Sequence, residues 1–176
     1  RDARLLHRLD AETAGLILVA KHEAADRRWK KRLSRLVAVK EYYARVWGVP
    51  SWEHLEDFTP LSERTDSEIR TRMYPVTDGD SDAYRNVKQC HSEFDVIKTE
   101  GETSIIRCRI YTGRKHQIRA HLAAQGHPIV GDKIYSCDGS FYLKRLQSPL
   151  STYDFETLGA ECQLLVASTL VLNLPG

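Results

Sequence analysis

The chain has 176 residues, of which 41% are hydrophobic and 28% are charged, and its formal net charge is +2. This length favours one domain, over residues 1–176, with a hydrophobic core of its own. The small net charge excludes a strong overall attraction to nucleic acid, so any such affinity has to come from local clusters of Lys and Arg. We expect no membrane association, because no apolar run approaches the roughly 20 residues of a membrane span.

The cysteines and histidines do not form a metal-binding pattern. The cysteines are Cys90, Cys108, Cys137 and Cys162. They include neither a C-x-x-C pair nor a zinc-finger spacing, which favours reduced thiols in a cytoplasmic protein. His116 and His121 are five residues apart, whereas a helical zinc clamp needs two histidines four residues apart. The sequence therefore predicts no metal ion.

The first half of the chain predicts two strands separated by a helix. Residues 15–21 are an apolar run typical of a buried strand, and residues 40–48 alternate in polarity as a strand does. Between them, residues 22–36 favour a helix. Its predicted core face consists of Ala25, Trp29, Leu33 and Leu36. Its opposite face is basic and carries Arg27, Arg28, Lys30, Lys31, Arg32 and Arg35.

The second half predicts mostly strands. The patterning indicates a loop over 49–66, a strand over 69–74, a turn over 77–81, two strands over 93–98 and 104–111 joined near Gly101, a helix over 116–125 and a strand over 163–172. Strands that follow one another, with few helices, predict an α+β fold with a mixed, largely antiparallel central sheet and flanking helices.

The first group of residues that could carry chemistry is His7-Arg8-Leu9-Asp10, just before the first predicted strand. A basic neighbour would hold Asp10 in its ionised form. An ionised and partly desolvated carboxylate is a competent nucleophile. Taken alone, however, an Asp before a strand is more often a turn or capping residue.

The second group is the strand that contains Tyr42. A tyrosine in a strand usually belongs to the core, with its hydroxyl bonded to a buried partner. The functional alternative is an aromatic face on which a nucleobase stacks.

The third group, over residues 112–121, is the most informative. A helix that starts there would combine backbone N–H groups with the side chains of Arg114, Lys115 and His116, which together suit a phosphate. Arg114 and Arg119 would lie about 140° apart around such a helix. We therefore expect one of them to hold phosphate and the other to reach a carboxylate. A solvated basic helix start is the simpler alternative.

In this order, the three groups resemble the RluA-type pseudouridine synthases, which modify ribosomal and transfer RNA. HRLDAETAG resembles the family signature H-R-L-D-x-x-T-S-G, with Ala14 in place of Ser, and KEYYARVWG is similar to K-x-Y-x-A-x-V-x-G. TGRKHQIRAHLAAQGHPIVGDKIY is similar to T-G-R-x-H-Q-I-R-x-H-L-x-x-x-G-H-P-I-x-G-D-x-x-Y, after which Ser136 replaces a Gly. The resemblance is clear over residues 5–48 and 104–135.

The resemblance implies an enzyme that flips a uridine out of structured RNA and isomerises it to pseudouridine without a cofactor. Asp10 matches the catalytic aspartate and Tyr42 the active-site tyrosine. Arg119 matches the basic partner of the aspartate, and Arg8 the arginine that fills the gap left by the flipped nucleotide. We expect RNA contacts from Arg8, His7, Arg114, Lys115, His116, Arg27, Arg28, Lys31 and Arg35.

Family domains normally have a further strand and a lysine-proline loop before H-R-L-D. We therefore expect the sheet to lack its usual N-terminal strand and the chain to associate with itself or to need an upstream segment. One alternative function is an RNA-binding or RNA-folding protein that keeps the scaffold with little or no catalysis. Another, a metal-dependent RNA hydrolase, has no ligand set in the sequence to support it.

Overall fold

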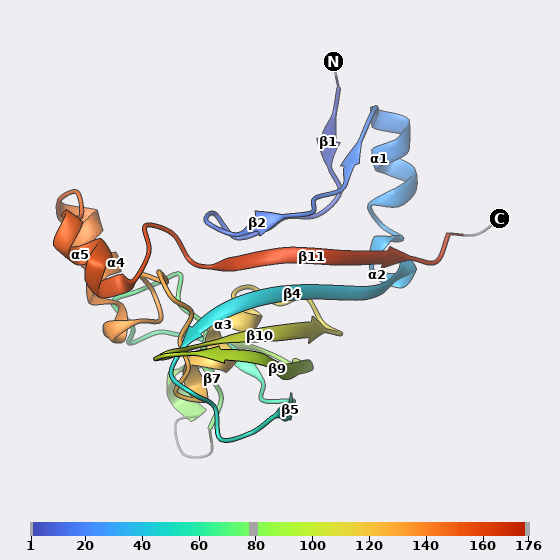
Figure 1. The fold of residues 1–176 in the computed structure, drawn as a ribbon. Helices are drawn as coiled ribbons and strands as arrows, with labels where there is room; N and C mark the ends of the chain where they lie inside the picture. Colours follow the sequence, from blue (N-terminus) through green and yellow to red (C-terminus); the bar gives the residue numbers. More distant parts are fainter. Residues whose placement is uncertain (1, 78–80, 175–176) are drawn as a thin grey trace.

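A computed structural model of the chain describes residues 2–77 and 81–174 (Figure 1). Its strands are β1 (Arg4–Leu5), β2 (Ala14–Gly15), β3 (Val19–Ala20), β4 (Val37–Trp47), β5 (His54–Asp57), β6 (Leu61–Arg64), β7 (Tyr74–Pro75), β8 (Tyr84–Lys88), β9 (Ser92–Glu100), β10 (Thr103–Ile110) and β11 (Leu165–Leu172). Its α-helices are α1 (Glu23–Trp29), α2 (Leu33–Leu36), α3 (Gln117–Ala124), α4 (Ser140–Gln147) and α5 (Thr152–Leu158). Short 3₁₀ turns cover Ser81–Ala83 and Cys137–Gly139.

Within the described residues, six strands form a central sheet in the order β2-β11-β4-β10-β9-β5. Only the β2–β11 pair is parallel there, and the other neighbours are antiparallel. Figure 1 shows the four long strands running side by side, with α1 and α2 near one end and α4 and α5 near the other. This arrangement confirms the predicted α+β fold with a mixed, largely antiparallel sheet.

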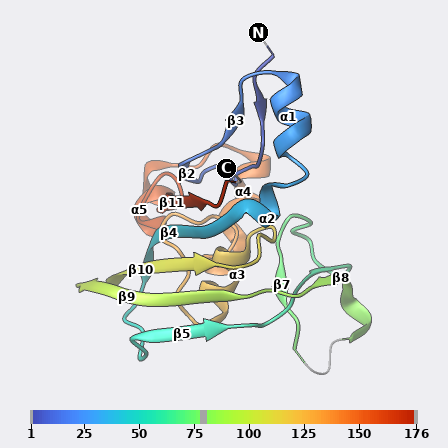
Figure 2. The same ribbon diagram turned by 90° about the vertical axis from the view of Figure 1, so that its right-hand side faces the viewer.

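Two smaller sheets stand beside the central one. β1 pairs with β3, and β6 lies between β7 and β8. Figure 2 shows the β1–β3 pair and α1 rising above the central sheet, while β7 and β8 lie to one side of it. In the described ranges, no helix has both the length and the apolar character that crossing a membrane requires.

Helix α3 is the centre of the packing. Its Ile118 and Leu122 join a cluster against the central sheet, completed by Ala44, Val46, Phe94, Ile106, Cys108, Ile129 and Leu165. Its Ala120 joins a second cluster with Leu61, Ile69, Met73, Cys90, Ile134 and Tyr135. Because both clusters bury apolar surface, α3 is held from two sides.

The outer face of the central sheet is charged. Arg109 on β10 pairs with Glu41 on β4 at 2.8 Å and with Glu93 on β9 at 3.2 Å. Arg107 pairs with Asp95 at 3.0 Å.

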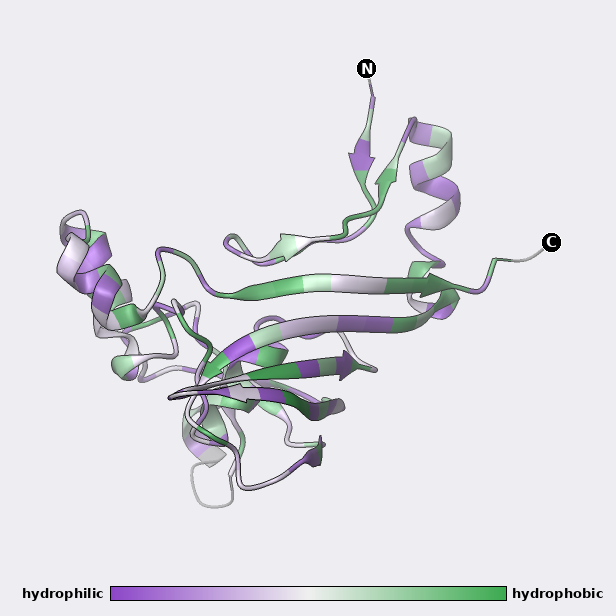
Figure 3. Cartoon of the chain, in the orientation of Figure 1, coloured by the Kyte–Doolittle hydropathy of each residue, from purple (hydrophilic) through white to green (hydrophobic). Residues whose placement is uncertain are grey.

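In Figure 3, β11 is hydrophobic at both ends, whereas α1 is mainly hydrophilic, as expected of a helix with one solvated face.

Most long elements predicted from the sequence are confirmed. The strand over 40–48 is most of β4, the strands over 93–98 and 104–111 are β9 and β10, and the strand over 163–172 is β11. The turn at Gly101 has a φ of +58°, which glycine adopts readily. The helix over 116–125 is α3, and Gly126 follows it with a φ of +82°.

Four of the predicted elements are wrong. The run over 15–21 is not one buried strand, because β2 pairs with β11 while β3 pairs with β1 in another sheet. Its side chains at Leu16, Ile17 and Val19 are 40–49% exposed. The helix over 22–36 breaks into α1 and α2, because the N–H of Arg32 bonds to the carbonyl only three residues back.

The remaining two lie further along the chain. The expected loop over 49–66 contains β5 and β6, whose polar side chains conceal the strand pattern. The expected strand over 69–74 is mostly a turn, in which the hydroxyl of Ser67 accepts the N–H of Ile69. The predicted turn over 77–81 falls largely on residues 78–80, which lie outside the described residues. Helices α4 and α5 had no sequence prediction.

Gly15 tests how tightly the loop after Asp10 is docked. Its φ is +112°, and a Cβ built there would lie 2.2 Å from the carbonyl oxygen of Ala167 on β11. We expect Gly15→Ala to lower the free energy of unfolding by at least about 3 kcal/mol, because backbone strain and a backbone clash add together. Chemical denaturation measures this change.

Gly101→Ala is the matched control. Gly101 also has a positive φ, but its added Cβ meets nothing within 4 Å. We expect this variant to lose only about 1–2 kcal/mol, the cost of the left-handed backbone conformation alone. Equal losses at the two glycines would show that β2 is not docked on β11 as described.

Candidate active site

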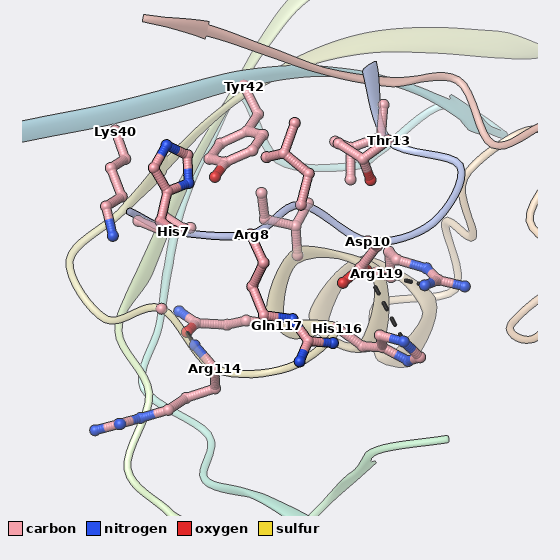
Figure 4. Close-up of a pocket in the computed structure, with 15 residues that line it drawn as sticks. His7, Arg8, Asp10, Thr13, Lys40, Tyr42, Arg114, His116, Gln117 and Arg119 are labelled. Atoms are coloured by element: carbon pink, nitrogen blue, oxygen red, sulfur yellow. Dashed lines mark hydrogen bonds and ion pairs between the residues drawn. The ribbon is translucent and has the colours of Figure 1, made fainter. Parts of the chain in front are cut away.

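The loop between β1 and β2, the strand β4 and the start of α3 enclose a cavity of about 220 Å³ (Figure 4). Its lining consists of His7, Arg8, Leu9, Asp10, Thr13, Lys40, Tyr42, Ile110, Gly113, Arg114, His116, Gln117, Ile118, Arg119 and Leu165. The three residue groups singled out in the sequence therefore meet at one place, although they are far apart along the chain.

A buried arginine connects two carboxylates in this cavity. Arg119 donates from Nη1 to Oδ2 of Asp10 at 2.9 Å, and from Nε and Nη2 to Asp132 at 2.7 and 2.9 Å. The side chain of Arg119 is 7% exposed, that of Asp132 is fully buried, and that of Asp10 is 21% exposed. Burial alone would lower the pKa of Arg119, but the two carboxylates raise it above its ordinary value, so the guanidinium stays charged.

Asp10 thus has one oxygen engaged and one oxygen facing the cavity. Figure 4 shows its carboxylate between Arg119 and His116. Its Oδ1 makes no hydrogen bond within the described part of the chain. A carboxylate held rigidly through one oxygen, with the other free, is suited to nucleophilic attack.

Asp132 keeps Arg119 in place. Besides the two bonds from Arg119, its Oδ1 accepts the N–H groups of Ile134 at 2.9 Å and Tyr135 at 3.2 Å. The guanidinium of Arg119 also lies over the ring of Tyr135, 5.2 Å from the centroid. A fully buried carboxylate is stable only with such partners, so Asp132 and Arg119 require each other.

The loop that carries Asp10 is tied down on its far side. Glu12 accepts a hydrogen bond from Lys133 at 2.8 Å and another from Arg145 at 2.7 Å. Thr13 accepts one from Gln163 at 2.6 Å. Asp10 is therefore fixed from within by Arg119 and from behind by three other segments of the chain.

His116 lies inside the site, not on its surface. It has a φ of +56°, is 8% exposed, and its Nδ1 is 3.2 Å from the hydroxyl of Tyr135. Its Nε2 is 3.9 Å from Oδ2 of Asp10. Burial and the charge of Arg119 lower the pKa of His116 to about 4, so it is neutral near pH 7. Any contact of His116 with RNA would therefore be made by a neutral side chain, and the expectation of such a contact stays a prediction.

Tyr42 forms the opposite wall of the cavity. It comes from β4, where its neighbours Ala44 and Val46 on the same face are buried in the core. Burial, and secondarily the charge of Asp10, raise the pKa of the Tyr42 hydroxyl. Figure 4 shows its ring facing the same space as Asp10. Ile110 and Leu165 add apolar surface, so the cavity can accept a flat ring.

The remaining cations divide between the cavity rim and the surface. Arg8, Lys40 and Arg114 line the cavity, and Figure 4 shows Arg114 pointing away from Asp10. His7 also lines it, but burial lowers its pKa, and its Nε2 accepts the N–H of Leu18 at 3.0 Å. His7 is therefore a structural acceptor in this arrangement and not a cation.

Five residues expected to contact RNA do not line this cavity. Lys115 lines a neighbouring cavity of about 260 Å³, which shares Arg8, Asp10, His116 and Arg119 with the first. The other four are exposed on α1, on α2 and in the turn between them. They are Arg27, Arg28, Lys31 and Arg35.

Three residues of the site had no role predicted from the sequence: Asp132, Gln117 and Lys40. Gln117 bonds to the carbonyl of His91 at 3.0 Å and to the hydroxyl of Ser92 at 2.8 Å, which fixes the start of α3 on β9. The sequence could have indicated the role of Asp132, because a carboxylate next to an apolar stretch is expected to be buried and then needs a cation as its partner.

One group of side chains has the composition of a metal site. The ligand atoms of His54, Glu93 and Asp95 lie within 4.8 Å of one another on the charged face of the sheet. Arg109 already neutralises Glu93, and Arg107 neutralises Asp95, so the cluster is balanced without a cation. It also lies outside the cavity that contains Asp10.

The sequence model described as RNA pseudouridylate synthase matches residues 1–124, more than half of the chain. The chain belongs to the RNA pseudouridylate synthase family. This confirms the resemblance stated from the motifs.

Two relatives within this family show how far the similarity extends. The chain is 34% identical over 135 residues to the dual-specificity RNA pseudouridine synthase RluA of Vibrio cholerae, covering 77% of this chain and 51% of that protein. It is 35% identical over 136 residues to RluA of Escherichia coli K12, covering 76% of this chain and 58% of that protein. The chain thus spans between half and three fifths of the length of these relatives.

Solved structures support the pseudouridylate synthase fold over the whole chain. Human RNA pseudouridylate synthase domain containing 1 superposes with a TM-score of 0.74 at 22% identity, over 99% of this chain and 69% of that one. Human RNA pseudouridylate synthase domain containing 4 superposes with a TM-score of 0.64 at 25% identity, over 98% of this chain and 72% of that one.

The low pKa of His116 predicts a pH-dependent stability. The unfolded chain protonates this residue near its ordinary pKa of 6.5, whereas the folded chain does so near 4. Because the unfolded state binds more protons between these values, this contribution to stability is lost as the pH falls from about 6.5 to about 4.

We expect His116→Asn to flatten this pH dependence of the unfolding free energy. Asn tolerates a positive φ, so the backbone is preserved. Burial also lowers the pKa of His7 and His121, but these residues are present in both proteins and cancel in the comparison. Denaturation curves at about pH 7 and about pH 5 measure the difference. Identical pH slopes for the two proteins would contradict the buried, neutral state of His116.

Asp132→Asn tests the support beneath Arg119. The amide keeps the shape but removes the charge that balances Arg119, so we expect the unfolding free energy to fall by about 3–5 kcal/mol. Asp138→Asn, the same change in an exposed turn, is the control and should leave stability unchanged. A stable Asp132→Asn protein would mean that Asp10 alone suffices to hold Arg119.

Proposed function

We propose that this chain is an RNA pseudouridine synthase that isomerises specific uridines of ribosomal or transfer RNA, with residues 1–176 acting as one catalytic domain. The observation that carries the proposal is the carboxylate of Asp10, held at 2.9 Å by the buried Arg119 on the wall of a cavity that Tyr42 also lines. The RluA relatives are named as dual-specificity RNA pseudouridine synthases, which supports the same reaction and substrate class.

In this proposal the target uridine leaves its stack and enters the cavity, with Asp10 as nucleophile. The bond between ribose carbon one and uracil nitrogen one breaks, the uracil rotates, and carbon five bonds to the ribose. The hydrogen on carbon five leaves as a proton, and nitrogen one gains a proton. Attack on the ribose and attack on the uracil ring are both compatible with the position of Asp10. The atoms balance without a cofactor.

The other residues have distinct roles in the proposal. Tyr42 stacks on the uracil, and because its pKa is raised, its hydroxyl is protonated near neutral pH and acts as a hydrogen-bond donor. Arg119 is a positioning residue that orients Asp10. Arg8 fills the gap that the flipped nucleotide leaves in the RNA.

Cations around the cavity hold the RNA backbone. Arg114 and Lys115 are exposed beside the cavity, and the basic face of α1 and α2 extends the same charge. That face comprises Arg27, Arg28, Lys31 and Arg35. We further propose a cytoplasmic location, where such RNA and reduced thiols occur together, consistent with four free cysteines.

Release of tritium from RNA labelled at carbon five of uridine tests the reaction directly. We expect Asp10→Asn to reduce this release by at least about a thousandfold while it leaves RNA affinity nearly unchanged, because the amide keeps the shape but is not a nucleophile. Asp138→Asn serves again as the control. Wild-type protein that binds RNA without releasing tritium would establish the alternative, an RNA-binding protein on the same scaffold.

A further inference from the structure

Three aromatic rings form an exposed stack near the active-site cavity. His91 lies between Phe58 and Tyr111, with 4.2 Å between ring centroids on either side and interplanar angles of 21° and 17°. The outer rings are largely in solvent, since Phe58 is 56% exposed and Tyr111 is 52% exposed. The hydrophobic core therefore does not account for this arrangement.

The stack is held rigidly. The hydroxyl of Tyr111 donates to Oε2 of Glu93 at 2.6 Å, and Nε2 of His91 lies 3.2 Å from Oε1 of Glu56. The backbone N–H of His91 donates to the hydroxyl of Thr112 at 2.9 Å, and its carbonyl accepts a bond from Gln117. Because Gln117 also lines the active-site cavity, one set of bonds fixes both the stack and the site.

A further cavity, of about 300 Å³, lies beside the stack and is called the second cavity below; it is distinct from the cavity that Lys115 lines. Tyr111 lines this cavity, whereas Phe58 and His91 do not, so Tyr111 is the ring of the stack that reaches it. The second cavity shares part of its wall with the active-site cavity. The shared residues are Lys40, Ile110, Gly113 and Arg114.

Two cations stand at this shared wall. Nε of Arg114 donates to the carbonyl of Gln89 at 3.0 Å, which fixes the guanidinium. Within the described part of the chain, neither the terminal nitrogens of Arg114 nor Nζ of Lys40 has an acidic partner. Figure 4 shows both side chains on the same side of the active-site cavity, away from Arg119. A positive charge without a protein partner favours an anion at this place.

We propose that the second cavity binds the nucleotide adjacent to the target uridine, with its base stacked on Tyr111 and the linking phosphate between Lys40 and Arg114. This inference rests on the proposed function, because it takes the active-site cavity as the place of the uridine. Stacking on an aromatic side chain tolerates every base, and an ordered ring that already stacks on His91 requires little further ordering. Tyr111 thus becomes a determinant of how the flanking RNA is held.

The test uses single-stranded RNAs of about nine nucleotides with one central uridine. This length is comparable to the stretch of RNA or DNA that single-strand-binding proteins cover. In two further RNAs, an abasic nucleotide replaces the neighbour on the 5′ or the 3′ side of the uridine. Affinities are measured by fluorescence anisotropy in the Asp10→Asn protein, in which we expect turnover to be at least about a thousandfold slower. We expect one abasic RNA to bind about tenfold more weakly, and Tyr111→Leu to weaken binding of the intact RNA by a similar factor.

The decisive result is the combination. If the missing base and Tyr111 act together, Tyr111→Leu with that abasic RNA loses about tenfold in total, not a hundredfold. Tyr111→Phe keeps the ring and should bind as the parent does. Tyr153→Leu, on a tyrosine of α5 that is even more exposed than Tyr111, is the control and should leave both affinities unchanged. Independent losses, or no loss with either abasic RNA, would overturn the proposal.

A second measurement does not depend on how Tyr111→Leu folds. With 2-aminopurine as the flanking base, stacking on Tyr111 should quench its fluorescence when the RNA binds the Asp10→Asn protein, and an unquenched complex would overturn the proposal. Both measurements report binding alone. If the coupling is found but the wild-type protein releases no tritium, the isomerase function is refuted and this subsite is kept. If tritium is released but no coupling is found, the subsite is refuted and the isomerase function is kept.

Discussion

The structure of the site depends on one guanidinium shared by two carboxylates. Asp132 takes two of the hydrogen bonds of Arg119, and Asp10 takes the third. Two negative charges therefore surround one positive charge, and the less buried carboxylate, Asp10, carries the excess where a substrate can reach it. The buried pair is costly to desolvate, but once formed it leaves Asp10 little freedom to turn away from the cavity.

Contacts between α3 and the rest of the fold fix the position of this guanidinium. Ser92 is fully buried at the start of β9, and its hydroxyl accepts a hydrogen bond from Nε2 of Gln117 at 2.8 Å. The same hydroxyl lies 3.0 Å from Nδ1 of His121, one helical turn further along α3, so the helix is bonded to the sheet at two of its residues. Apolar clusters on two sides of α3 complete its placement. The carboxylate of Asp10, although on a loop, is thus positioned by a helix and a sheet.

The sequence predicted elements well where alternation marks two unlike faces, as in β4 and β10, and poorly at edge strands such as β5, where Leu55 is the only apolar residue of four. The spacing of Arg114 and Arg119 predicted that one of them reaches a carboxylate, and the resemblance identified Arg119, which bonds to Asp10 in the structure. The helical spacing was, however, an incomplete reason. Arg114 precedes α3, and its direction follows from its bond to the carbonyl of Gln89, a contact that no helical spacing encodes. The burial of His116 likewise arises from packing against Tyr135, 19 residues further along the chain.

The bonds that hold the loop of Asp10 span most of the chain. Arg119 reaches Asp10 across 109 residues, Lys133 reaches Glu12 across 121, and Gln163 reaches Thr13 across 150. Contacts this distant in sequence close large loops and are entropically slow to form during folding. The placement of Asp10 in the cavity therefore depends on contacts with residues far along the chain. A molecule with a formed sheet but a detached first segment would keep Arg119 on α3 and lose the carboxylate of Asp10 from the cavity.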